Sequence, residues 1–467
     1  IYLFYIPNCI PLKSPVPHLV LQLDPTATPS YLGWVVAAYS LGQLIASPFF
    51  GGWANLRRSS REPLTASLIM TVLFNVLYMY LQSIPDKPQV YMIVARGLVG
   101  FSAGHTAVVR SYISAATTLK ERTACMANVS IFQAVGFILG PVIQTCMVPL
   151  HFPGPVESPS LHINMYTAPA MFASILAVIN LLLVMFVFKE HKVGGLEEAG
   201  VANSKLLDVT EESKPDLVGV LSTIFLFFVI LFMFTVFETI GTPLTMHMYA
   251  WTKTEATLYQ GIILGASAAS SIVVFVIVKI LVKRINERYL LLAGLVISLG
   301  AFFLFIPWGP SLPPLAFIRR STSTTSSTKS TTPPSTTTIA PANRTVSPEG
   351  CPWQYSWCRH VPALPLFQYL AATLVFSVGY PMCQMLSYTI FSKILGSQPQ
   401  GVWMGWITAA GSLARTVGPI YVSQVYDKSG PQATFGSVAG VIFLTIIFYL
   451  VMFRRLVPCK STADREN

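Results

Sequence analysis

The sequence predicts an all-α membrane protein built from two pseudo-symmetric bundles of six helices, with a poorly defined first helix. Of its 467 residues, 53% are hydrophobic and only 10% are charged, whereas soluble domains carry about 25% charged residues. Apolar runs of about 20 residues, long enough to cross a bilayer, recur along the whole chain. A repeated sequence pattern then divides these runs into two matching sets.

Eleven apolar segments are expected to be helices, because lipid offers no partner to unpaired backbone groups. They cover residues 31–50, 63–82, 89–109, 124–148, 165–188, 217–240, 258–282, 289–308, 364–391, 401–424 and 434–453. Residues 1–20 would have to supply a twelfth helix, but four prolines interrupt this stretch. We therefore expect a truncated or misassembled start there, and it does not have the form of a secretory signal.

The repeated pattern is a methionine followed by a Gly-Pro pair. Met126 precedes Gly140-Pro141 by the spacing that separates Met404 from Gly418-Pro419, and the two copies lie 278 positions apart. A Gly-Pro pair in an apolar helix allows close backbone approach and bends the axis. Its occurrence in matching helices of two halves is typical of a duplicated membrane transporter.

This repeat predicts the domain organisation. We expect an N-terminal bundle over residues 1–188, a polar cytosolic linker over 189–216, a C-terminal bundle over 217–455 and a cytosolic tail over 456–467. The linker mixes acidic residues with lysines and glycines, so it cannot bury a core of its own.

The net charge of +11 is distributed over alternate loops and does not form one patch. This is the positive-inside pattern, which places both termini and the linker in the cytosol and argues against a nucleic-acid partner. The basic residues assigned to these loops are Arg57, Arg58, Arg61, Arg110, Lys120, Arg122, Lys189, Lys192, Lys205, Lys214, Lys283, Arg284, Arg288, Lys393, Arg454, Arg455 and Lys460.

The loop over residues 309–361 is expected on the opposite, lumenal side. Residues 321–338 are nearly all Ser and Thr, a composition that O-glycans favour, and Asn343-Arg344-Thr345 is an N-glycosylation sequon. Cys351 and Cys358 lie in the same loop. An oxidising compartment would favour a disulfide between them.

Charged residues inside apolar segments are the first functional candidates, because charge in a bilayer is costly. Arg96, Glu238 and Arg415 are such residues. In one interpretation the two arginines attract an anion, and Glu238 pairs with them or carries a proton. In the other, an Arg–Glu pair only holds the two halves together.

Three further features of the apolar segments bear on the solute path. Arg96, Gly100 and Gly104 recur at helical spacing, which leaves a groove beside the arginine. His105 falls on the opposite face from Arg96, so a packing role is favoured over proton transfer. Gly379-Tyr380-Pro381 is expected to break its helix near Gln384. A broken helix would expose carbonyls to a solute, and the alternative is a plain proline kink.

The chain has no nucleotide fingerprint, P-loop, HExxH or GxSxG motif. We therefore expect no enzyme activity, cofactor or metal site, and transport driven by an ion gradient or by downhill flow. Gly51-Gly52-Trp53-Ala54-Asn55, with Arg57 and Arg58, fills a cytosolic loop. Such loops usually hold one conformation of a transporter and do not contact the solute.

These features together resemble the major facilitator superfamily. The segment 51–61 looks like its loop signature, although Asn55 stands where the family usually has an acidic residue. Residues 96–104 fit its RxxxGxxxG pattern, and Gly136 to Pro141 fit its GxxxGP pattern, which is associated with antiporters. The resemblance implies a twelve-helix facilitator fold.

Other segments are similar to a lysosomal branch of that superfamily. They are Asp24-Pro25-Thr26-Ala27, Leu32-Gly33-Trp34-Val35, Arg110-Ser111-Tyr112, Phe237-Glu238-Thr239-Ile240, Pro243-Leu244-Thr245-Met246 and Pro399-Gln400-Gly401-Val402. This similarity implies a glycosylated protein of the endolysosomal membrane, with chloride permeation as its activity.

Three functions follow as hypotheses. The preferred one moves chloride or another small anion, with Arg96 and Arg415 supplying positive potential and Glu238 making flux depend on lumenal pH. The second is a proton-coupled carrier of an organic metabolite, and the third is a non-transporting receptor or scaffold. The expected partners are a small solute and the lipid bilayer, without nucleic acid or an obligate protein partner.

Overall fold

A computed structural model describes residues 29–83, 88–150, 154–158, 161–164, 167–190, 216–316, 350–352, 354–396 and 399–457. Four sequence predictions lie outside these residues. They are the first helix, most of the 189–216 linker, the Ser/Thr-rich segment with the Asn343 sequon, and the end of the tail after residue 457.

The first half of the described chain contains six α-helices. They are α3 (Pro29–Arg57), α4 (Arg61–Met79), α5 (Pro88–Ser102), α6 (His105–Ala115), α7 (Leu119–Met147) and α8 (Ala168–Phe186). Short 3-10 turns follow α4 and α7 at Tyr80–Ser83 and Val148–Leu150. A small antiparallel hairpin joins α7 to α8, with β1 (Val156–Ser158) paired to β2 (Leu161–Ile163).

The second half contains five helical elements and one 3-10 turn. They are α10 (Leu217–Tyr249), α11 (Lys253–Leu281), α12 (Glu287–Phe305), η5 (Ser356–Arg359), α13 (Leu366–Leu395) and α14 (Gly401–Met452). The 52 residues of α14 are two helices joined at Gly430, where φ is 75° and ψ is −173°. Only glycine adopts this left-handed conformation without strain.

All eleven expected segments are helical. Nine helices within the described residues are long and apolar enough to cross a membrane, and α14 contributes two crossings. The remaining segment is α3, which carries Ser40, Gln43 and Ser47 as buried polar residues because it packs in the middle of the molecule. The predicted fold class, an all-α membrane protein with two six-helix halves, is confirmed.

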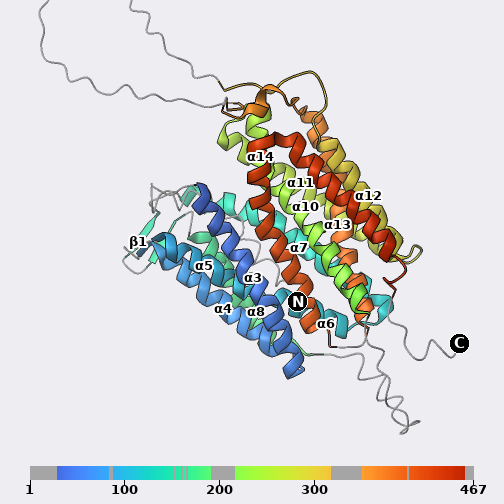
Figure 1. Ribbon diagram of the computed structural model, residues 1–467. Coiled ribbons are helices and arrows are strands. Elements are labelled where there is room, and N and C mark those ends of the chain that lie inside the picture. Colours follow the sequence, from blue (N-terminus) through green and yellow to red (C-terminus); the bar gives the residue numbers. More distant parts are fainter. Residues whose placement is uncertain are drawn as a thin grey trace, which may run out of the picture.

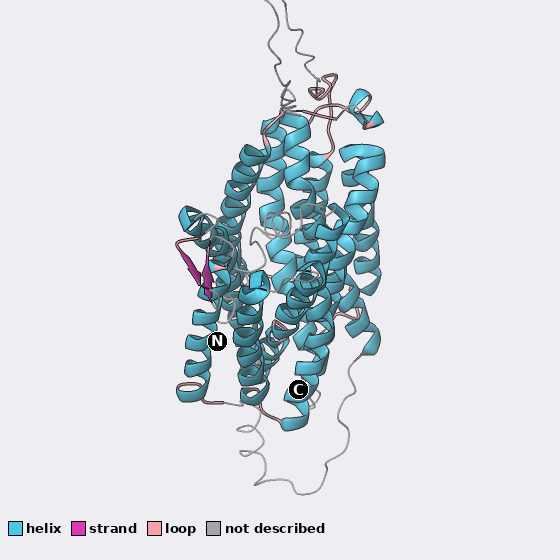
Figure 2. Cartoon of the chain, turned by 90° about the vertical axis from the view of Figure 1, so that its left-hand side faces the viewer, coloured by secondary structure: helices cyan, strands magenta, loops and turns pink. Residues whose placement is uncertain are grey.

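Two long helices join the halves. α3 packs along α14, and α14 also packs against α10, while α7 contacts α11. Figure 1 shows α3, α4, α5 and α8 on one side and α10 to α14 on the other, with α3 and α14 side by side where the two groups meet. The strands form a small hairpin beside an otherwise helical molecule (Figure 2).

The prediction of a broken helix at Gly379-Tyr380-Pro381 is wrong. α13 runs as a continuous helix from Leu366 to Leu395 with Pro381 inside it. Gly379 instead allows α12 to approach, because a Cβ at this position would lie 2.5 Å from Ser298 Oγ and 3.0 Å from the Gly294 carbonyl oxygen. The break that does occur lies in the expected segment 89–109, where α5 ends at Ser102 and α6 begins at His105.

Candidate functional site

A polar cavity lies between the two halves. Its volume of about 60 Å³ exceeds the roughly 15 Å³ that one buried water needs, so it accommodates a small solute. Helices α3, α6 and α7 line it from the first half, and α10, α13 and α14 line it from the second. Its polar lining residues are Tyr39, Gln43, Thr106, Arg110, Gln133, Gln384, Tyr388, Thr408, Ser412 and Arg415.

Arg110 is the central charged group of this cavity. It lies on α6, is only 3% exposed, and donates a hydrogen bond of 2.9 Å from Nη2 to Gln133 Oε1 of α7. Its guanidinium carbon stands 3.7 Å from the ring centroid of Tyr388 on α13. A cation–π contact at this distance is attractive, so one side chain is held by both halves.

Arg415 brings a second guanidinium to the cavity from α14. Tyr380 lies within electrostatic range of Arg415, Glu238 and Arg110, and its ring stacks on Phe234 at 4.5 Å. Gln384, 8% exposed, lies on α13 between Tyr380 and Tyr388 and lines the cavity. Of the candidates chosen from sequence, Arg415 and Gln384 therefore line the cavity, whereas Tyr380 and Glu238 are not among its described lining residues.

The 278-residue offset of the sequence repeat reappears here as a contact. Arg110 stacks on Tyr388, and Ser114 Oγ lies 2.7 Å from Ser392 Oγ, a pair separated by 278 positions. Residues at equivalent positions of two related halves meet only close to the axis that relates them. The cavity therefore lies on the pseudo-twofold axis, where duplicated transporters hold their solutes.

The structure corrects the expected places of two arginines. Arg110 was assigned to a cytosolic loop, but α6 continues to Ala115 and carries Arg110 into the bundle. Arg96 is 2% exposed on α5, 5.8 Å from the ring centroid of Tyr39, and is absent from the residues that line the cavity.

One end of the molecule, here called the closed end, is sealed between the halves. Gly51 of α3 meets Gly401 of α14 so closely that a Cβ on Gly51 would lie 2.1 Å from the Gly401 carbonyl oxygen. Asn55 Oδ1 accepts a bond of 2.9 Å from the Gly401 amide, and its Nδ2 donates to the Pro399 carbonyl at 3.3 Å. An amide both donates and accepts here, which a carboxylate at this position cannot do.

A buried ionic network seals the same end beside Asn55. Arg122 of α7 donates to the carbonyl oxygens of Ser392 at 3.1 Å and Ser114 at 2.8 Å. Glu287 accepts from Thr123 of the other half at 2.5 Å and forms an ion pair with Lys393. Direct contacts between the halves thus close this end of the cavity.

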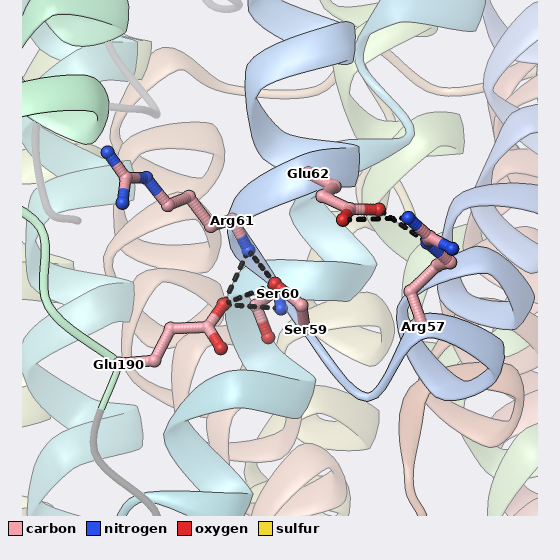
Figure 3. Close-up of polar contacts among 6 residues, drawn as sticks. All are labelled: Arg57, Ser59, Ser60, Arg61, Glu62 and Glu190. Atoms are coloured by element: carbon pink, nitrogen blue, oxygen red, sulfur yellow. Dashed lines mark hydrogen bonds and ion pairs between the residues drawn. The ribbon is translucent and has the colours of Figure 1, made fainter.

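The loop from α3 to α4 forms a separate network within the first half (Figure 3). Arg57 pairs with Glu62 at 2.7 Å, with both side chains exposed. Glu190, just beyond α8, accepts bonds from the Ser60 and Arg61 amides at 2.6 Å each. This carboxylate satisfies donors at the start of α4, where the helix dipole favours negative charge. Arg58 adopts a positive φ of 52° in this loop.

The motif glycines lie mainly at helix contacts. A Cβ on Gly100 would lie 2.0 Å from the Tyr39 carbonyl oxygen, and one on Gly104 would lie 2.6 Å from Ala46 Cβ, both on α3. Gly418 contacts α10, because a Cβ at this position would lie 2.7 Å from Thr235 Cγ2. Gly136, Gly140 and Pro141 lie within α7, and Pro419 lies within α14, without ending either helix.

His105 has a structural place at the start of α6. Its Nδ1 lies 2.7 Å from Ser67 Oγ and 2.9 Å from the Ser102 carbonyl oxygen, and the residue is 1% exposed. These contacts hold α4 against the break between α5 and α6. They support the packing role favoured by the sequence.

The opposite end, here called the capped end, carries a small disulfide-linked cap. Cys351 and Cys358 are bonded to each other, and Trp357 of η5 packs on Gly430, where a Cβ would lie 2.7 Å from the ring. Burial and the neighbouring Asp427 raise the pKa of Tyr355 above its ordinary value. The cap thus lies over the turn that splits α14.

The comparisons with known proteins agree with this architecture. The Major Facilitator Superfamily family model matches residues 12–342. The chain is 43% identical over 450 residues to "Major facilitator superfamily domain-containing protein 8" of Xenopus laevis, covering 95% of this chain and 88% of the relative.

Two solved structures share the fold. The proton:xylose symporter XylE aligns with a TM-score of 0.66 at 14% identity, covering 98% of this chain and 94% of that one. The human organic anion transporter MFSD10 aligns with a TM-score of 0.60 at 16% identity, covering 93% of this chain and 88% of that one. The chain is therefore a multi-pass membrane protein that belongs to the major facilitator superfamily of transporters.

Proposed function

We propose that this transporter moves chloride or another small anion through the cavity between its halves. The observation that carries the proposal is the pair of arginines, Arg110 from the first half and Arg415 from the second, that line one cavity. No acidic side chain is among the described residues lining it. Two fixed guanidinium groups in a low-dielectric setting favour an anion and oppose a cation.

The sealed end of the molecule favours a carrier over an open pore. The contacts of Asn55 with Gly401 and of Arg122 with Ser392 block the cavity at one end. A continuous channel would have to break them. An alternating cycle, in which these contacts open while the other end closes, uses them as one of its two gates.

A proton-coupled carrier of an organic metabolite is the second candidate. The cavity wall also offers Gln133, Gln384 and Ser412, which donate and accept hydrogen bonds in a way that suits a polar organic anion. One solved structure with this fold is that of the human organic anion transporter MFSD10. Both candidates share the arginine pair and differ in the size of the anion.

The membrane that we propose is endolysosomal, with the closed end in the cytosol. The basic residues Lys283, Arg284, Lys393 and Arg454 gather near the closed end, as the positive-inside rule requires of a cytosolic face. The Cys351–Cys358 disulfide lies at the other end. Disulfides persist in oxidising compartments and are rare in the cytosol, so this supports placing the capped end in the lumen.

Recording from patched, enlarged lysosomes that express the protein tests the proposal. Replacing chloride by a large impermeant anion should abolish the current if chloride is the solute. Absence of a chloride-dependent current, together with saturable uptake and counterflow of an organic anion, would instead establish the second candidate. Absence of both, in a folded and correctly located protein, would overturn the arginine pair as a transport site.

A further inference from the structure

A second cavity lies inside the C-terminal bundle at the closed end, away from the solute path. Its volume is about 240 Å³, four times that of the central cavity. Its polar walls are Asn286, Glu287, Arg288 and Lys393, and apolar side chains of α11 and α13 complete it. The charges on its walls decide what kind of ligand it accepts.

The one acidic wall residue is already neutralised. Glu287 forms an ion pair with Lys393 and accepts a further bond from Thr123. Arg288 has no carboxylate partner among the described residues: its Nη1 donates to the Phe453 carbonyl at 3.1 Å. The Arg288 Nε is buried without a hydrogen-bond partner in the described part of the chain. The cavity thus presents a net positive wall.

Arg288 is held in a fixed orientation. Its guanidinium carbon stands 5.0 Å from the ring centroid of Phe453, and the carbonyl of Arg288 accepts a bond of 2.8 Å from Tyr449. A planar guanidinium fixed in this way loses little entropy when it binds a phosphate through paired N–H groups. The geometry suits a phosphate group better than a single halide.

Additional positive charge surrounds the cavity. Lys283 and Arg284 directly follow the wall residue Val282, and Arg454 and Arg455 directly precede the wall residue Leu456; all four are exposed. With Arg288 and Lys393 this makes six basic residues. Two acidic residues, Glu287 and Asp216, offset part of this positive charge. Asp216 Oδ2 lies 3.6 Å from Arg455 Nη1.

The cavity also lies beside a lipid-facing surface. Ile285 and Tyr289 are 42% and 58% exposed, and the Tyr289 ring lies 5.2 Å from the Phe453 ring that supports Arg288. Aromatic and basic side chains together are typical of the level of lipid headgroups. Basic pockets between membrane helices at this level bind phosphorylated headgroups.

We propose that this cavity binds the phosphorylated headgroup of an anionic membrane lipid, with Arg288 as its main phosphate ligand. The inference is independent of which solute the central cavity carries. A lipid bound in this cavity would also affect the contact between the two halves. Glu287 lines the lipid cavity and bonds Thr123 of the other half, so an occupied cavity would stabilise the closed end.

Binding of short-chain lipids to the purified full chain, measured by native mass spectrometry, tests the proposal. The probes are phosphatidylinositol phosphate, phosphatidylcholine, the free inositol phosphate and inorganic phosphate. We expect phosphatidylinositol phosphate to bind most tightly. Arg288→Gln should weaken it about fivefold, the effect of one basic residue near a membrane surface.

Two further variants keep the test decisive. Arg284→Gln with Arg454→Gln changes only exposed side chains, so it should fold even if Arg288→Gln does not, and should also weaken binding. Lys189→Gln, an exposed basic residue after α8 in the other half, should leave binding unchanged. Equal loss in Lys189→Gln, or equal binding of phosphatidylcholine, would overturn the site. Equal binding of the free inositol phosphate or of inorganic phosphate would overturn its assignment to lipid.

Discussion

Arg110 makes contacts on both sides of the pseudo-symmetry axis. Gln133 anchors it in its own half, and the Tyr388 ring holds it from the other at 3.7 Å. Because the two contacts pull in different directions, the guanidinium stays at the cavity instead of turning toward one bundle. The ring is therefore a positioning group for the anion site.

Two substitutions of Tyr388 distinguish the role of its ring from the role of its hydroxyl. Tyr388→Leu removes the ring, and we expect anion flux to fall about fivefold, since a desolvated cation–π contact contributes roughly 1 kcal/mol or more. Tyr388→Phe keeps the ring and should retain flux. Flux into proteoliposomes measures both variants, and equal loss in the two would mean that the hydroxyl, not the ring, matters.

Glu238 is expected to oppose the attraction of the arginines for an anion. It lies within electrostatic range of Tyr380, as do Arg415 and Arg110, and a carboxylate there lowers the positive potential that the guanidinium groups supply. Glu238→Gln removes this opposing charge, so anion flux into proteoliposomes should rise.

The matched control for Glu238 is Glu255→Gln. Glu255 lies in the capping box of α11 with Thr252, and glutamine preserves such a box. This control should transport at the wild-type rate in the same flux assay. A Glu238→Gln rate identical to wild type would remove Glu238 from the mechanism.

Sequence reasoning found only part of this residue-level arrangement. Arg415 and Glu238 were found because they interrupt long apolar runs. Arg110 was assigned to a loop because Ser111, Lys120 and Arg122 follow it, and a polar cavity wall has the same composition as a loop. The uninterrupted stretch from Arg110 to Ala115, without Gly or Pro, was the available signal that the helix continues.

At the level of elements, Gly100 sets how closely α5 approaches α3. A Cβ there would lie 2.0 Å from the Tyr39 carbonyl oxygen, a contact that only backbone movement can relieve. We expect Gly100→Ala to lower the free energy of unfolding by about 1–3 kcal/mol, the usual cost of overpacking. Denaturation in detergent micelles measures it.

Gly265→Ala is the control for helix propensity alone. This glycine lies within α11, and a Cβ there meets nothing within 4 Å, so the substitution should raise the free energy of unfolding by about 0.5–1 kcal/mol, the gain in helix propensity. A Gly100→Ala protein as stable as Gly265→Ala would mean that α3 and α5 do not pack this closely in the membrane.

Helix positions were predictable from sequence, whereas helix continuity was not. Apolar length alone located every described crossing, because the bilayer imposes it. It could not show that α13 continues through Pro381, or that the segment 89–109 breaks at Gly104. Contacts with neighbouring helices decide both: α12 packs on Gly379, and α3 packs on Gly104.

At the scale of the whole molecule, duplication explains where the site lies. The 278-residue offset read from two Gly-Pro pairs also relates Arg110 to Tyr388 and Ser114 to Ser392, which meet at the axis. The repeat was visible in the sequence, but the partners across the axis were not. Which equivalent residues touch depends on how the two bundles tilt toward each other.

This architecture makes transport a property of both halves together. Arg110 and Arg415 come from different bundles, so the cavity keeps both arginines only while the bundles stay together around it. Rigid tilting of one bundle against the other would expose the same two arginines to each side in turn. The central claim is therefore that both arginines bind the transported anion.

Chloride flux into proteoliposomes containing matched amounts of folded wild type, Arg110→Ala, Arg415→Ala and Lys428→Ala tests this claim most directly. Lys428 is exposed near the capped end and serves as the control. We predict that each arginine variant lowers flux by about 30-fold or more, as removal of a buried charged ligand does, while Lys428→Ala transports normally. Wild-type flux in either arginine variant would contradict the account.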